Sequence, residues 1–152
     1  MPKLIIPIGP AGCGKTTWWR NHIYSTAGRI SADNIRFTKL KYPDSGIDFD
    51  PQIEPEVWQE VWEDFIKYCS VPAINIYLDC TNLTQTIRNP FIHVARSFGY
   101  TIEIVWFKTS LFQCLLNNKK RERHVPEDVI ARQFLALQPP EGWEYDTIIE
   151  VN

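Results

Sequence analysis

The sequence lacks several features that would assign it to a familiar class of protein. Its 152 residues carry a formal net charge of −2 at pH 7, so we expect no broad basic surface of the kind that coats DNA or RNA. No apolar stretch approaches the length of a membrane span. The four cysteines include no CxxC pair and no cysteine–histidine cluster suited to zinc. These absences predict a soluble, cytoplasmic protein with reduced thiols and no membrane contact.

The apolar pattern that is present indicates one α/β domain over residues 1–152. Short apolar runs predict strands, at residues 4–8, 29–31, 73–78, 101–107 and 147–151. Segments with helical periodicity or capping signals lie between them, at 15–24, from 33 onward, and at 55–68, 88–98, 110–118 and 127–137. Alternating strands and helices are typical of a parallel sheet with helices on both faces. We therefore expect a three-layer α/β/α fold with a parallel central sheet of four to five strands.

Residues Gly9 to Thr16 match the phosphate-binding motif G-x-x-x-x-G-K-[ST] at every defined position. The motif lies between an expected strand and an expected helix, which is the context in which it binds a nucleoside triphosphate. Its glycines let successive backbone N–H groups turn inward onto phosphate oxygens, while the lysine reaches the β- and γ-phosphates and the threonine hydroxyl ligates Mg²⁺. The residues expected to hold this cofactor are Gly12, Cys13, Gly14, Lys15, Thr16 and Thr17.

A kinase needs a base for the acceptor hydroxyl and a grip on the acceptor as well as a phosphate loop. Asp33 and Arg36 lie three residues apart after an expected strand, so on a helix they would share a face. The carboxylate would accept the hydroxyl proton, and the arginine would hold an anionic group of the acceptor. A helix cap with a local salt bridge explains the same spacing. The guanine signature Asn-Lys-x-Asp of GTPases is absent.

Two further segments fit kinase chemistry. Asp79 ends an apolar run and resembles the Walker B acid that positions magnesium through water, although polar residues at strand ends are common. Residues 119–124 carry four formal cations between two expected helices. A solvated helix end accounts for such a run, but a lid at about residues 115–130 would bring an arginine onto the transferring phosphate.

Together these motifs resemble the P-loop polynucleotide 5′-kinases over nearly the whole chain. The resemblance rests on the order and spacing of Gly12-Cys-Gly-Lys-Thr-Thr-Trp18, Asp33-x-x-Arg36, Asp79-Cys-Thr-Asn-Leu83 followed by Arg88, Asn118-x-x-Arg121, and Val125-Pro126. The chain departs from the family at Cys13, where serine is commoner, and in the short gap between Arg121 and Val125.

The resemblance implies an ATP-dependent phosphotransferase with the P-loop kinase fold and a helical lid, which acts on 5′-OH ends of DNA or RNA with ATP and Mg²⁺. It assigns catalysis to Lys15, to Asp33 as the general base and to Arg121 as the lid arginine. Because the gap before Val125 is short, Arg123 is a rival for that contact with ATP. The residues implied in acceptor binding are Asp33, Arg36, Asn82 and Arg88, and those implied in metal binding are Thr16 and Asp79.

Two other functions fit the same core. A small-molecule kinase acting on a nucleoside, a sugar or an antibiotic would use the same base, whereas an ATP-binding module with little turnover would not need Asp33. The resemblance also implies that 3′-end trimming and ligation fall to separate phosphatase or ligase partners. A phage-encoded member would work in the host cytoplasm. The sequence leaves the oligomeric state open.

Overall fold

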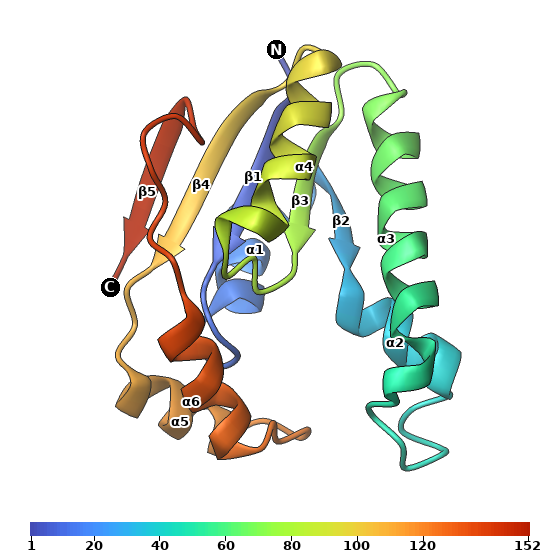
Figure 1. The fold of residues 1–152 in the computed structure, drawn as a ribbon, viewed down its shortest axis with the longest axis vertical. Helices are drawn as coiled ribbons and strands as arrows, with labels where there is room; N and C mark the ends of the chain where they lie inside the picture. The colour runs from blue at the N-terminus through green and yellow to red at the C-terminus, as the bar shows by residue number, and fades with distance from the viewer.

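The computed structural model describes all 152 residues, Met1 to Asn152. Five parallel strands form one central sheet in the order β2-β3-β1-β4-β5 (Figure 1). The strands are β1 (Lys3–Ile8), β2 (Ala27–Ser31), β3 (Asn75–Asp79), β4 (Thr101–Phe107) and β5 (Thr147–Val151). The expected parallel sheet is thereby confirmed, and residues 147–151 form one of its edges.

Helices cover both faces of the sheet, which confirms the three α/β/α layers. They are α1 (Lys15–His22), α2 (Ala32–Leu40), α3 (Glu54–Cys69), α4 (Gln85–Ser97), α5 (Leu111–Lys119) and α6 (Glu127–Ala136), with a short 3₁₀ helix, η1 (Pro51–Ile53), before α3. α3 and α4 pack on the face that is in front in Figure 1, and α1 packs on the other face with side chains of α5 and α6. No helix is both long enough and apolar enough to cross a bilayer.

The central strand β1 shows why both faces of the sheet are covered. Leu4, Ile6 and Ile8 pack with α3 and α4, whereas Ile5 packs in the layer that contains α1. These four side chains are at most 2% exposed. Successive side chains of a strand lie on opposite faces, so the unbroken apolar run from Leu4 to Ile8 must be buried on both.

The start of α4 differs from the sequence prediction. The helix begins at Gln85 and not at Arg88, because the Thr84 hydroxyl caps it by accepting a hydrogen bond from the Ile87 N–H. Pro90 therefore lies inside the helix. Because proline has no backbone N–H, the helix lacks the i→i−4 hydrogen bond that residue 90 would otherwise donate to residue 86.

The carboxyl ends of the strands meet at one edge of the sheet, at the bottom of Figure 1. The phosphate loop follows β1 there, α2 follows β2 on one side, and α5 and α6 lie on the other side, joined by residues 120–126. Ligands of parallel sheets bind outside this edge. The fold therefore brings the phosphate loop, the predicted base and the predicted lid to the same end of the molecule.

Candidate active site

The phosphate loop owes its course to its glycines. Gly12 and Gly14 have φ angles of +84° and +110°, in the left-handed region that residues with a side chain rarely adopt. A Cβ on Gly9 would collide with the Cys13 Sγ, and one on Gly12 would collide with the Cys114 carbonyl oxygen. Gly14 precedes α1 without a side-chain cap, which leaves the first N–H groups of that helix available to an anion.

Lys15 folds back onto the loop that precedes it. Its Nζ donates to the carbonyl oxygens of Gly9 and Pro10 over 2.7 and 3.0 Å. Thr16 and Thr17 follow in the first turn of α1, the first half-buried and the second exposed. A phosphate bound in the loop would compete with the two carbonyl oxygens for the ammonium group, because charge-assisted hydrogen bonds are stronger than those to neutral acceptors.

The α5–α6 hairpin contacts the rim of the phosphate loop through residues that no motif predicts. Asn117 Nδ2 donates to the Gly12 carbonyl oxygen over 2.8 Å, and Gln133 Oε1 accepts from the Ala11 N–H over 2.9 Å. These partners are 105 and 122 residues apart in the sequence, so only the fold reveals them. The predicted lid is thus hydrogen-bonded at its base to the loop that would hold the donor.

Asp33 and Arg36 share a face of α2, as their spacing predicts. Arg36 donates through Nη1 to Asp33, and through Nε and Nη2 to the two carboxylate oxygens of Glu54 over 2.9 and 2.7 Å. The Asp33 side chain is 46% exposed and that of Arg36 only 11%. The Asp33 carboxylate is therefore accessible, and it lies beside a guanidinium that Glu54 holds in place.

The charges around Arg36 favour its ionised form. Burial would lower the pKa of this guanidinium, but the hydrogen bonds and charges of Glu54 and Asp33 raise it by more, and the net shift is upward. In the sequence Glu54 is explained by its place at a helix N-terminus, where acids are favoured. Only the folded structure shows that Glu54 pairs with Arg36, which lies 18 residues earlier in the sequence.

The two arginines of the predicted lid differ in their surroundings. Arg123 Nε donates to Asp48 Oδ2 over 3.2 Å, and its Cζ lies 5.0 Å from the ring centroid of Phe37 in α2. Arg123 therefore bridges the lid to the side of the molecule that carries Asp33. Arg121, in contrast, is exposed.

Asp79 lies at the end of β3, as expected, and pairs with an arginine. Arg29 Nε donates to Asp79 Oδ2 over 2.8 Å, and the Arg29 Cζ lies 4.5 Å from the ring of Trp19. No group of three or more His, Cys, Asp or Glu side chains is placed to hold a metal ion. Mg²⁺ requires no such cage, because it keeps several waters and binds substrate phosphates. Thr16 stays a predicted ligand of a magnesium–triphosphate complex, whereas Asp79 would have to share its charge with Arg29.

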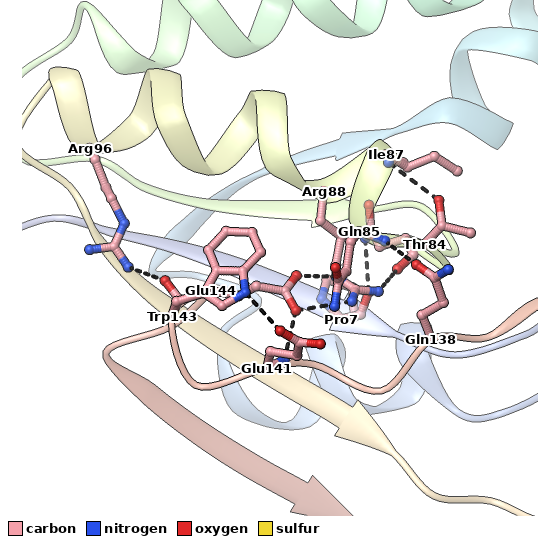
Figure 2. Close-up of polar contacts among 11 residues, drawn as sticks. Pro7, Thr84, Gln85, Ile87, Arg88, Arg96, Gln138, Glu141, Trp143 and Glu144 are labelled. Carbon is pink, nitrogen blue, oxygen red and sulfur yellow. Dashed lines mark hydrogen bonds and ion pairs between the residues drawn. The ribbon is translucent and has the colours of Figure 1, made fainter.

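Asn82 and Arg88, which the resemblance implies in acceptor binding, are buried. Arg88 donates through Nε and Nη2 to the two carboxylate oxygens of Glu144 over 2.6 and 3.1 Å (Figure 2). Its Nη1 donates to the Asn82 carbonyl oxygen over 2.9 Å. The side chains of Arg88 and Glu144 are 0% exposed. The Asn82 amide donates to three backbone carbonyl oxygens. The burial of Asn82 and Arg88 does not fit a direct contact of either side chain with an acceptor. Their hydrogen bonds instead hold the loop at residues 80–84.

Known proteins share this architecture. A family model described as AAA domain, AAA_33, matches residues 4–140. A chain of the Pnkp1/Rnl/Hen1 RNA repair complex has a TM-score of 0.75 and 21% identity, over 90% of this chain and 44% of that chain. The present chain therefore spans less than half of that relative.

Two further solved structures are similar. A gluconokinase from Sinorhizobium meliloti 1021 has a TM-score of 0.65 and 16% identity, over 99% of this chain and 83% of that chain. A chain of the AvrRxo1-ORF1:-ORF2 structure with ATP has a TM-score of 0.70 and 16% identity, over 90% of this chain and 47% of that chain. At identities this low, structural similarity establishes a common fold and nothing more specific.

Proposed function

Because the chain belongs to the AAA domain family whose model matches residues 4–140, a P-loop kinase-like family, we propose that it is an ATP-dependent polynucleotide 5′-hydroxyl kinase. It would transfer the γ-phosphate of ATP to 5′-OH ends of DNA or RNA. The observation that carries the proposal is the half-exposed Asp33 carboxylate beside Arg36, at the same sheet edge as the phosphate loop.

The acceptor side supplies a proton acceptor and an anion grip. Asp33 Oδ1 accepts from Arg36, so Oδ2 is left to take the proton of the acceptor hydroxyl. A guanidinium has five N–H donors, of which Glu54 takes two and Asp33 one. The remaining two would hold the phosphate on the 3′ side of the first nucleotide. An acceptor that carries such a phosphate gains this contact, and a plain nucleoside does not.

The donor side supplies the groups that stabilise the transferring phosphoryl group. The backbone N–H groups of the phosphate loop and the ammonium of Lys15 would bind the ATP phosphates. Arg121 is the better of the two lid arginines for this contact, because Arg123 already pairs with Asp48. Magnesium, when bound through Thr16 and waters, would neutralise charge on the phosphate oxygens. The lid of this single domain would comprise about residues 115–130.

A small-molecule kinase is the second candidate. It is favoured by the similarity in size to the gluconokinase, of which this chain covers 83%. Such an enzyme would use Asp33 in the same way but would not depend on an acceptor phosphate. If the first proposal holds, ligase or phosphatase partners would act on the same nucleic-acid ends.

Transfer of label from ATP distinguishes the candidates. The acceptors are a 5′-OH DNA oligonucleotide, its RNA counterpart, a nucleoside 3′-phosphate, a plain nucleoside and gluconate. We expect transfer to the oligonucleotides and to the nucleoside 3′-phosphate. Transfer to the nucleoside or to gluconate, with none to any oligonucleotide, would overturn the proposal in favour of a small-molecule kinase. Absence of transfer to all acceptors would favour an ATP-binding module.

A further inference from the structure

An exposed aromatic ring lies beside the acceptor pair and belongs to neither hydrophobic core. Phe49, in the connection between α2 and η1, is 53% exposed, and its ring centroid lies 5.8 Å from the Cζ of Arg36. Both core clusters of the molecule exclude it. Packing therefore does not explain an aromatic residue here, and the ring keeps an open face next to the arginine that would grip the acceptor.

The residues on either side of Phe49 hold its backbone in position. The Asp50 carboxylate accepts a hydrogen bond from the Gln52 N–H over 2.9 Å and caps η1. The Asp48 carboxylate accepts from Arg123 over 3.2 Å. Phe49 thus lies between a residue that caps η1 and a residue that pairs with the lid. The ring is therefore exposed on a segment that makes hydrogen bonds on both sides of it.

Other aromatic side chains nearby are already in contact with a partner. Phe37 and Tyr42 pack against each other with ring centroids 4.8 Å apart. Arg123 lies over the Phe37 ring as well. Among these rings Phe49 is the most exposed.

We propose that Phe49 is the platform on which the nucleobase of the acceptor's first nucleotide stacks. This inference rests on the proposed function. Asp33 would meet the 5′-hydroxyl and Arg36 the phosphate on the 3′ side, so the nucleoside between them must lie next to Arg36, where Phe49 is. Every base has a π-face, so stacking on one ring tolerates all sequences. Contact with the Arg36 cation orients the same ring.

The test compares acceptors with and without the first base. A 5′-OH oligonucleotide and the same oligonucleotide with an abasic first nucleotide are offered to the wild type, Phe49→Ala, Phe49→Trp and Ile47→Ala. Ile47 is a matched control, since it lies in the same connection and is also 53% exposed. We expect Phe49→Ala to raise the acceptor KM for the normal oligonucleotide by ~5- to 150-fold, the range for one lost base–aromatic stack, with kcat nearly unchanged.

Three further results are expected if the ring is the platform. Phe49→Trp keeps the wild-type KM, Ile47→Ala changes nothing, and the abasic acceptor has a high KM that Phe49→Ala does not raise further. An equal KM increase for both acceptors would overturn the platform and leave Phe49 a role in loop shape. An unchanged KM in Phe49→Ala would overturn it as well.

A binding measurement without ATP separates this inference from the proposed function. An oligonucleotide with 2-aminopurine as its first base should lose fluorescence on binding the wild type and Phe49→Trp, but not Phe49→Ala. Wild-type kinase activity on oligonucleotides without such quenching would refute the platform alone. Failure of the wild type to bind or phosphorylate any oligonucleotide would refute the proposed function, and the platform with it.

Discussion

Arg36 and Arg88 form the same type of ion pair in two regions of the molecule. In both, Nε and Nη2 donate to the two carboxylate oxygens of a glutamate, which is Glu54 for Arg36 and Glu144 for Arg88. The side chains of the Arg88 pair are 0% exposed. Those of the Arg36 pair are 11% and 22% exposed, and Asp33 makes a third, more exposed contact.

The difference in burial separates a structural pair from a pair that a ligand can reach. The Nη1 of Arg88 donates to the Asn82 carbonyl oxygen, so Arg88 joins the loop at residues 80–84 to Glu144 in the segment before β5. Arg36 directs Nη1 at a carboxylate that is nearly half exposed. Residue type and pairing geometry are therefore a poor guide to function, and access to solvent is the better one.

The largest effect is expected where the pair is fully buried. Glu144→Gln would leave the Arg88 guanidinium charged, buried and without its counter-charge. Breaking a buried pair in this way costs about 3–5 kcal/mol of unfolding free energy. Urea denaturation followed by tryptophan fluorescence measures this loss.

Two other glutamates complete the series. Glu54→Gln should cost less than Glu144→Gln, because the Arg36 pair is partly solvated. Glu150→Gln is the control, since its pair with Lys108 is 51% exposed on the glutamate side and should contribute at most about 1 kcal/mol. Equal losses at positions 54 and 144 would break the comparison.

The second effect concerns turnover and not stability. Asp33→Asn keeps the shape of the side chain but removes the proton acceptor, so kcat should fall ~10²-fold or more. The unfolding free energy should change by at most about 1 kcal/mol, because the Asp33 side chain is exposed. Steady-state phosphorylation of a 5′-OH oligonucleotide and urea denaturation test the two parts. Wild-type kcat in this variant would remove Asp33 from its proposed role.

The third effect concerns acceptor affinity. Arg36→Lys keeps the charge but cannot donate to Glu54, Asp33 and a phosphate together, since an ammonium lacks the planar fork. We expect the acceptor KM to rise ~10-fold or more while the KM for ATP stays constant. Arg88→Lys is the matched variant in the buried pair and should lower stability, with little change in the acceptor KM of the folded fraction. A rise in the KM for ATP alone would contradict the assignment of Arg36 to the acceptor.

The smallest effect is expected at the bridge between Asp48 and Arg123, where the aspartate side chain is 43% exposed. Asp48→Asn removes the charge that pairs with Arg123, and exposed pairs contribute at most about 1 kcal/mol, or roughly fivefold in affinity. In dilute buffer the acceptor KM of the variant should differ from that of the wild type within that range. In high salt the two KM values should become equal. A larger shift that persists in salt would mean that this bridge behaves like a buried pair.

The sequence predicts the parts of this molecule that depend on local pattern. The strands follow from apolar runs, the phosphate loop from its motif, and the shared face of Asp33 and Arg36 from helical spacing. Glu54, Gln133 and Glu144 could not be predicted as partners, because each contacts a residue 18, 122 or 56 positions away. The same limit explains why the burial of Arg88 could not be predicted. Arg88 is buried together with Glu144, and no local sequence pattern connects the two residues.

The pairing of Arg88 with Glu144 also has a consequence for the order in which the protein is made. Arg88 leaves the ribosome 56 residues before Glu144. During that interval α4 would have to pack on the sheet with an unpaired guanidinium, which is costly. We therefore expect the face covered by α4 to stay incompletely assembled until Glu144 has left the ribosome exit tunnel. A nascent chain stalled with Glu144 inside the tunnel should be more sensitive to protease at α4 than one extended by a linker so that Glu144 has emerged.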